Sequence, residues 1–441
     1  MQSAFDVEPS YQLELVGRIL SPQLLEELRE NPSLESLCLD SLEESSMTSM
    51  TEVMEVLQQL TSLRRLDLSD LTLKKEHIQA LGSLRSLEEL TLAAIDCQPG
   101  ELATISSLPS VRKLTLENVP MTVSVLEKLQ TLSSLRMLHF DNFDVAVDVH
   151  PTDLFRCLGE VSQLVELQLS LFDITPKQLQ RLSQLPNLKM LGINGSFKEG
   201  TLQKCARILP TFPSLRGFAY SNLADDEEQK MLDALSAWSS LETLILDYST
   251  FTSQQCENIG SFKGLRHLRL TGSTFLGGHV DFLEKLPHLK SLDLSMTKGV
   301  KSKGWKGLEA QTQLQELNLA TSTAGQSVGP ILRTMKSLRK LNVYGVPLSY
   351  ADFRFLRDQM ERVQGEFVVE STIFNLTRQE VHRFFVGVSM GGGLCYGLSE
   401  RMATPWALEK GWSPEVVWIT AILLGAFIGG SIALFLARRR S

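Results

Sequence analysis

The sequence predicts an α/β repeat protein in which short parallel strands alternate with short helices, followed by one membrane-spanning helix. Two observations predict the repeat: leucine triplets recur with a period of about 24 residues, and apolar residues spaced by three lie between the triplets. A third predicts the membrane helix, because residues 416–437 contain no charged side chain. The chain has 441 residues, of which 43% are hydrophobic, and this is enough for a large core.

The clearest triplets place leucine at positions i, i+3 and i+5, as in Leu241, Leu244 and Leu246. This spacing fits a short strand with one buried face. Extended along the chain, the pattern gives thirteen starting positions: Leu34, Leu63, Leu87, Val111, Leu135, Leu164, Leu188, Leu215, Leu241, Leu265, Leu289, Leu314 and Leu338. Such regular spacing indicates a repeat array.

The second half of each repeat carries an apolar stripe with a step of three residues, for example Ile78, Leu81 and Leu84. This stripe predicts a short α- or 3₁₀-helix that packs behind the strand. Proline follows several stripes, as at Pro109 and Pro186, and ends the helix there. We therefore expect a right-handed horseshoe solenoid with a parallel sheet on the concave side and short helices on the convex side.

The pattern resembles the leucine-rich-repeat family over roughly Tyr11 to Val369. The family usually has Asn or Cys at i+8, whereas this chain has mostly apolar or hydroxyl residues there, such as Leu71 and Ser249. Apolar residues cannot bond to the loop backbone, so we expect many turns to depend on packing. The resemblance implies protein binding by analogy. The predicted domains are an atypical capping repeat at 1–33, the solenoid at 34–371, a linker at 372–415 and the membrane helix at 416–437.

The run 416–437 would extend about 33 Å, enough to cross a bilayer core of about 30 Å. Its position before Arg438, Arg439 and Arg440 resembles the layout of tail-anchored proteins. The alternative is a hairpin in which the apolar, glycine-rich segment 384–398 also enters the membrane, an arrangement that the positive-inside tendency favours. Small residues recur every four positions within the span and predict a helix-pairing face for self-association: Ala421, Gly425, Gly429 and Ala433.

Several function classes are not expected. The net charge of −8 gives no basic face for nucleic acid, and the scattered cysteines fit a reducing compartment better than disulfides or zinc. No basic and apolar leader precedes Pro9, so we expect no signal peptide and a solenoid on the cytosolic side. No metal, phosphate or nucleophile motif is present. His139 and Asp141 share a strand face, but a lone His–Asp pair is weak support for catalysis, so we expect neither an enzyme nor a cofactor.

If the leucines point inward, the residues at i+2, i+4 and i+6 line the concave sheet. The most concentrated polar group in these columns is Asp247, His267, Arg269 and Asp293, on three adjacent predicted strands. We hypothesise that this group contacts a protein partner. The alternative is a solvated sheet face on which the charges pair sideways, since exposed ion pairs are common and weak.

Together these features predict a membrane-anchored leucine-rich-repeat scaffold that binds protein partners on the cytosolic side. The tether would raise the effective concentration of those partners at the bilayer. The alternative is a secreted bacterial effector that inserts a two-helix hydrophobic tail into a host membrane and captures host proteins there.

Overall fold

The computed structural model describes residues 12–369 except 18, 20, 43–48, 142–148, 171–172, 222–224 and 237. Within this range the chain divides into two compact units. The first unit comprises the described residues up to 274 together with 285–289. The second comprises residues 275–284 and 290–369.

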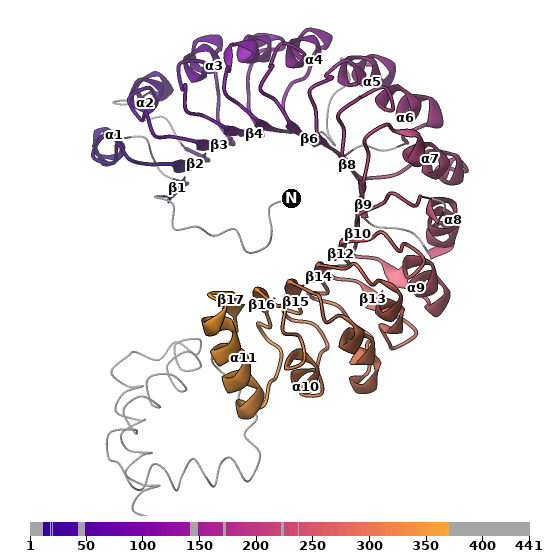
Figure 1. Ribbon diagram of the computed structural model, residues 1–441. Coiled ribbons are helices and arrows are strands. Elements are labelled where there is room, and N and C mark those ends of the chain that lie inside the picture. The colour runs from indigo at the N-terminus through magenta and orange to yellow at the C-terminus, as the bar shows by residue number, and fades with distance from the viewer. Residues whose placement is uncertain are drawn as a thin grey trace, which may run out of the picture. The chain divides into compact units, whose positions relative to one another are not determined.

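The strands of the first unit are parallel and follow one another in chain order, with their triplet leucines in register, as in Leu66 opposite Leu90. The strands are β1 (Gln12–Val16), β2 (Ser36–Asp40), β3 (Arg65–Ser69), β4 (Glu89–Ala93), β5 (Lys113–Glu117), β6 (Met137–Asp141), β7 (Glu166–Ser170), β8 (Met190–Asn194), β9 (Gly217–Ser221), β10 (Thr243–Asp247) and β12 (His267–Arg269). A short strand, β11 (Thr250–Phe251), follows β10. The sheet lines the inner side of this unit, as Figure 1 shows.

The helices of the first unit lie on the outer side of its sheet (Figure 1). They are α1 (Pro22–Arg29), α2 (Met50–Leu57), α3 (Lys75–Leu81), η1 (Glu101–Ser107), α4 (Val123–Leu129), α5 (Pro151–Gly159), α6 (Pro176–Leu182), α7 (Leu202–Ile208), η2 (Leu209–Thr211), α8 (Asp225–Leu235) and α9 (Ser253–Ile259). The elements labelled η are 3₁₀-helices, which suits a stripe with a step of three residues.

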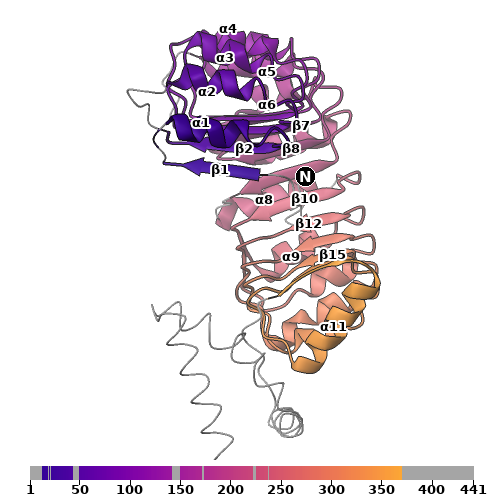
Figure 2. The same ribbon diagram turned by 90° about the vertical axis from the view of Figure 1, so that its left-hand side faces the viewer.

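The second unit repeats the same plan with shorter strands. Its parallel strands are β14 (Ser291–Asp293), β15 (Glu316–Asn318), β16 (Lys340–Asn342) and β17 (Glu366–Val368), and its helices are η4 (Ser302–Ala310), α10 (Val328–Leu332) and α11 (Tyr350–Arg362). The strand β13 (Thr274–Phe275) and the helix η3 (Asp281–Lys285) contain the boundaries between the units. Figure 2 shows α11, the last helix of the described chain, which is longer than the repeat helices before it.

The core confirms the predicted repeat. The leucines at i, i+3 and i+5 are buried, with Leu241 only 1% exposed and Leu244 and Leu246 fully enclosed. The helix stripes pack behind them, as Ile78 and Leu81 illustrate. Burying a leucine side chain contributes roughly 1.5–3 kcal/mol, so each repeat is stabilised mainly by this ladder. Strand, turn, helix and turn recur as the leucine-rich-repeat fold requires.

A sharp turn follows most strands whose next residues the structure describes, and the sequence pattern alone did not predict its geometry. The residue at i+7 takes a positive φ in most repeats: Ser41, Asp70, Ala94, Asn118, Tyr248, Gly272, Met296, Thr321 and Gly345. At Gly272, with φ of +68°, a Cβ would collide with the ring of Tyr248. Glycine is therefore favoured at Gly272 by the positive φ and above all by the ring of Tyr248, since other residue types adopt a positive φ at this position in other repeats.

The i+8 position differs along the chain, as its residue types predict. Leu71, Ile95 and Val119 are buried and stabilise their turns by packing. In the later repeats hydroxyl groups bond to the backbone instead. The Oγ atom of Ser273 donates to the carbonyl oxygen of Leu246 at 3.3 Å and accepts from the N–H of Ser249 at 3.1 Å.

Among the described residues, no helix has the length and apolar character that crossing a bilayer requires. The predicted span 416–437, the apolar segment 384–398 and the helix-pairing residues Ala421, Gly425, Gly429 and Ala433 lie outside the described residues. These predictions stay predictions.

Candidate functional site

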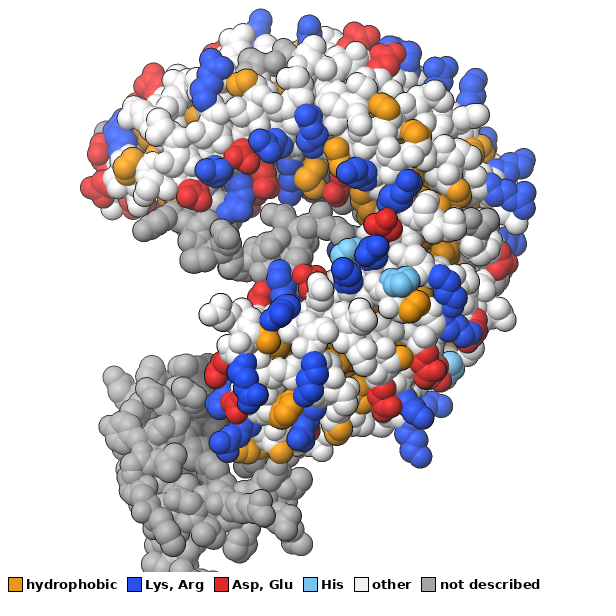
Figure 3. Space-filling view, in the orientation of Figure 1, with side chains coloured by type: hydrophobic (Ala, Val, Ile, Leu, Met, Phe, Trp, Pro, Cys, Tyr) orange, Lys and Arg blue, Asp and Glu red, His pale blue; other side chains and the backbone are white. Residues whose placement is uncertain are grey.

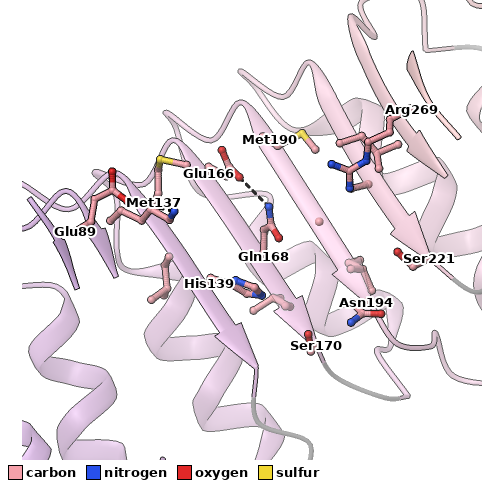
Figure 4. Close-up of a pocket in the computed structure, with 17 residues that line it drawn as sticks. Glu89, Met137, His139, Glu166, Gln168, Ser170, Met190, Asn194, Ser221 and Arg269 are labelled. Carbon is pink, nitrogen blue, oxygen red and sulfur yellow. Dashed lines mark hydrogen bonds and ion pairs between the residues drawn. The ribbon is translucent and has the colours of Figure 1, made fainter. Parts of the chain in front are cut away.

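The inner sheet face of the first unit is hollowed between β4 and β12. This hollow has a volume of about 410 Å³. Figure 4 labels side chains from strands between β4 and β12 that line it, and these labelled side chains stand at the outward-facing positions of their strands. Its lining residues are Glu89, Lys113, Met137, Leu138, His139, Glu166, Gln168, Leu169, Ser170, Met190, Gly192, Ile193, Asn194, Ala219, Ser221, Ile245 and Arg269.

The hollow exists because small residues occupy the middle of the sheet. Gly192 on β8 lies opposite Ala219 on β9, so two neighbouring strands present little or no side chain there. A Cβ at Gly192 would approach Cγ of Gln168 to 3.2 Å. At Gly217 a Cβ would collide with the sulfur of Met190, so this methionine already covers the glycine. The floor is therefore formed by small residues and by the adaptable side chain of Met190.

Polar and charged side chains border this floor. Lys113 pairs with Glu89 across β4 and β5, with 3.4 Å between Nζ and Oε2. On β7 the amide of Gln168 donates to Oε1 of Glu166 at 2.9 Å, the contact drawn as a dashed line in Figure 4. An apolar floor inside a polar border is the usual anatomy of a pocket that accepts one anchoring side chain of a partner protein.

Basic residues lie just before the first residues of several strands beside the hollow. Arg112, Arg136, Lys189 and Arg216 occupy the position just before β5, β6, β8 and β9, and Arg112, Arg136 and Lys189 are exposed. Figure 3 shows Lys and Arg side chains gathered along the inner margin of this unit. Part of this charge has a structural role, because the Arg136 guanidinium donates to the carbonyl oxygens of Ser133 and Leu135. The remaining charge leaves a basic edge next to the apolar floor.

One lining residue has an unsatisfied polar atom. Ser170 is 1% exposed, and among the described residues, which leave out 142–148 and 171–172 beside it, its Oγ has no hydrogen-bond partner. On the neighbouring strand, Asp141 lies opposite Ser170, and its Oδ1 is likewise buried and without a partner. Buried polar atoms are normally bonded, so this corner of the hollow offers hydrogen-bonding capacity to a water molecule or to a bound polar group.

These residue types do not form a catalytic arrangement. His139 lies two residues before Asp141 on β6, and Ser170 is on β7, so serine, histidine and aspartate occupy one corner. Activation of a serine requires bonds from serine to histidine and from histidine to the carboxylate. No such bond joins these three side chains in the described structure. The same part of the chain holds no group of three or more His, Cys, Asp or Glu side chains that could bind a metal.

Three residues of the polar group predicted from the sequence lie in the first unit, and two of them are bonded to each other. Nε and Nη2 of Arg269 donate to Oδ2 of Asp247 at 2.9 and 2.6 Å. The carboxylate also accepts the backbone N–H of Thr271 at 3.0 Å. The side chain of Asp247 is only 9% exposed, whereas that of Arg269 is 47% exposed. Arg269 therefore neutralises a carboxylate that the sequence pattern placed on an open surface.

The other two residues take separate positions. His267 lies on β12 opposite Thr243, two residues before Arg269. Asp293 belongs to the second unit, where it accepts from the backbone N–H and Oγ of Ser295 at 2.9 and 2.6 Å and from the amide of Asn318 at 3.0 Å. Partner binding by the four residues stays a prediction. The hollow itself was not predicted, although the run of Gly192, Gly217 and Ala219 in the outward-facing columns would have indicated it.

Comparisons with known proteins give a likeness of fold. No family model matches the chain, and no curated protein sequence matches it. Solved structures that resemble it include an internalin from Listeria monocytogenes, at 14% identity over 79% of this chain and 94% of that one, with a TM-score of 0.39. A leucine-rich-repeat protein from Leptospira interrogans shows 16% identity over 85% and 86%, with a TM-score of 0.34. A chain of the mouse RP105/MD-1 complex shows 18% identity over 84% and 68%, with a TM-score of 0.43.

Proposed function

We propose that this protein is a leucine-rich-repeat scaffold that binds a protein partner in the hollow of its first unit. The observation that carries the proposal is the gap that Gly192 and Ala219 leave inside a polar border. The partner would insert one apolar anchor residue over this floor. Acidic residues beside that anchor would face Lys189 and the other cations of the basic edge, which favours rapid and selective association.

The partner is proposed to be a protein because the hollow is broad and open. It extends over consecutive strands from β4 to β12, and a sheet face of this kind offers contact area around one central depression. Its lining contains no cysteine, and the cysteines near it are buried in helices, as Cys205 is in α7. The simplest account of the lining residues is that they form a binding surface and do not catalyse a reaction.

Site-specific crosslinking tests this part of the proposal. A photo-crosslinking residue at Ala219 should yield discrete protein adducts in living cells. The matched control is Gln180, which is exposed on α6 and faces away from the sheet. Adducts from Ala219 that are absent from Gln180 support a partner in the hollow. Equal adduct patterns from both positions would show that the hollow has no specific partner.

The membrane part of the proposal rests on residues 416–437. We propose that this run anchors the protein, leaves the solenoid on the cytosolic side, and pairs with a second copy through Gly425 and Gly429. Retention of the full chain in membranes after carbonate washing, and its release when the run is deleted, would support the anchor. Protease protection of tags at both ends then separates one span, with only the C-terminal tag protected, from a hairpin.

Asn194 provides an internal reporter of sidedness. It is exposed, lines the hollow and begins the sequon Asn194-Gly195-Ser196. In microsomes that glycosylate proteins, a cytosolic solenoid leaves Asn194 unmodified. A glycosidase-sensitive shift that disappears in Asn194→Gln would place the solenoid in the lumen and contradict the proposed orientation.

A further inference from the structure

The second unit carries four exposed lysines close together in sequence, Lys298, Lys301, Lys303 and Lys306. We call them the lysine cluster. In the described part of the chain, no ion pair joins any of them to a carboxylate. Glu309 is the acidic residue of η4, and it too forms no ion pair there. The cluster is therefore a patch of positive charge without internal compensation.

The backbone that carries the cluster is tightly fixed. The N–H of Lys301 donates to the carbonyl oxygen of Gly278 at 2.9 Å, and the carbonyl of Gly304 accepts from the N–H of Val280 at 2.9 Å. A Cβ at Gly304 or Gly307 would collide with the backbone of the Gly278–Val280 segment. The lysines thus project from a rigid support.

The side chains between the lysines fix which way they point. Trp305 is fully buried, as is Leu308 three residues later, so one side of η4 faces the core. Residues three apart eclipse each other on a 3₁₀-helix, so Lys303 and Lys306 share a different, solvent-facing side with Glu309 at its end. The repulsion between the two aligned lysines is unfavourable, and a bound anion would relieve it.

Charge is also distributed unevenly along the chain. The whole protein has a net charge of −8, and acidic residues outnumber basic ones in residues 1–274. Lys and Arg instead outnumber Asp and Glu in residues 290–369, which precede the predicted linker and membrane helix. Such an asymmetry is typical of a chain whose basic end lies at an anionic surface.

We propose that the lysine cluster binds the anionic headgroups of lipids in the membrane that holds the tail. This inference rests on the proposed function, which supplies the membrane. The lysines do not line the hollow, and recognition of headgroups requires only exposed, closely spaced cations near a bilayer. Contact through the cluster would hold the second unit against the membrane surface.

Lysine acetylation of the full chain in vesicles tests the proposal. One set of vesicles contains phosphatidylserine, the other only phosphatidylcholine, and mass spectrometry measures the acetylation rate of each lysine. We expect the cluster to react about fivefold more slowly in the anionic vesicles at low salt and to regain its full rate at high salt. Lys177 on α6 and Lys204 on α7 are exposed controls whose rates should not change.

A charge-reversed variant sharpens the test. Lys303→Glu combined with Lys306→Glu should remove the protection of Lys298 and Lys301, whereas Lys177→Glu combined with Lys204→Glu should leave it intact. Equal acetylation of the cluster in both kinds of vesicle would overturn the proposal and assign these lysines to a hydrated face or an acidic protein. Protection of the cluster in phosphatidylcholine vesicles to the same extent as in phosphatidylserine vesicles would overturn it as well.

Carbonate washing of the same vesicles distinguishes this inference from the proposed function. If the chain stays in the membrane after carbonate washing but its lysine cluster is acetylated at the unprotected rate, the anchor is supported and the headgroup contact is contradicted. If carbonate removes the chain but anionic vesicles protect its lysine cluster from acetylation, the anchor is contradicted and the headgroup contact is supported.

Discussion

The hollow and the Asp247–Arg269 pair lie on the same sheet of the first unit, but they differ in what they offer a partner. The pair satisfies itself, because Asp247 is enclosed and accepts from Arg269 and from the backbone of Thr271. The hollow has vacant space above Gly192 and Ala219, and the Oγ of Ser170 there has no hydrogen-bond partner in the described part of the chain. Charged residues that stand out in a sequence can thus serve the fold, while recognition depends on space that small residues leave.

The largest expected effect concerns the thiols behind these two regions. Burial raises the pKa of Cys256, on α9 behind the pair, to about 12, and that of Cys205, on α7 behind the hollow, to about 11. At pH 8 the native thiolate fraction of Cys256 is then roughly a thousandfold below that of an unfolded thiol. Both thiols are buried, so we expect alkylation by iodoacetamide to proceed only through local opening and to be far slower at each than at a free thiol. Alkylation at the rate of a free thiol would contradict the packing.

The same shifts fix the pH dependence of stability. A thiol whose pKa is raised on folding favours the native state at pH values below about 9, the ordinary value for a thiol. This contribution is lost as the pH rises from 9 toward 12. Chemical denaturation should therefore show falling stability over that range, and a Cys256→Ala variant should show a smaller fall.

The next effect tests whether the pair is structural. Arg269→Ala leaves the enclosed carboxylate of Asp247 without its cation and should lower the free energy of unfolding by about 2 kcal/mol. The matched control is Arg64→Ala, which breaks the exposed Arg64–Glu88 pair and should cost less than about 0.5 kcal/mol. Urea denaturation measures both. Equal losses of unfolding free energy would show that the enclosed Asp247–Arg269 pair stabilises the fold no more than the exposed Arg64–Glu88 pair.

Filling the hollow should have a smaller but specific effect. Ala219→Trp places a large side chain over the floor and should reduce partner capture about tenfold, because it occupies the space of the anchor residue. The control is Ala93→Trp on β4, at an outward-facing position outside the lining residues. Co-purification of the partner, without a crosslinker at position 219, quantifies capture. Undiminished capture by Ala219→Trp would place the partner elsewhere.

The smallest effect comes from Gly217→Ala. Its new methyl group collides with the sulfur of Met190, a flexible end that can move into the hollow. We expect a stability loss below about 1 kcal/mol and roughly a twofold loss of partner capture. Gly325→Ala, where a Cβ meets open space, should change neither quantity. A large loss of stability in Gly217→Ala would show that Met190 is fixed rather than adaptable.

The fold could be predicted from the sequence because the leucine spacing is itself the physical cause of the repeat. Leu241, Leu244 and Leu246 are buried for the reason their positions indicate. The candidate site was harder to predict. Asp247 and Ile245 stand in outward-facing columns, yet both are buried, because Arg269 reaches across Asp247 and Ile245 lies between Ala219 and Arg269 on the adjacent strands. The burial of an outward-facing side chain depends on its neighbours on the two adjacent strands. The residue types at one repeat position, read alone, do not reveal these neighbours.

The turn geometry shows the same limit. A positive φ at i+7 could be expected at Gly272 or Asn118, since glycine and asparagine adopt it readily. The same conformation at Tyr248 and Met296 has no local signal and is imposed by the repeat around it. The polar pattern likewise predicted four candidate residues but did not predict the hollow that one of them, Arg269, lines.

The most direct test of the central claim compares crosslinking from two positions on the same sheet. A photo-crosslinking residue is placed at Ala219, on the floor of the hollow, or at Thr271, beside the Asp247–Arg269 pair. If the hollow is the partner site, Ala219 gives a discrete adduct in high yield and Thr271 gives little. A strong adduct from Thr271 with none from Ala219 would contradict the account and restore the polar group as the contact surface.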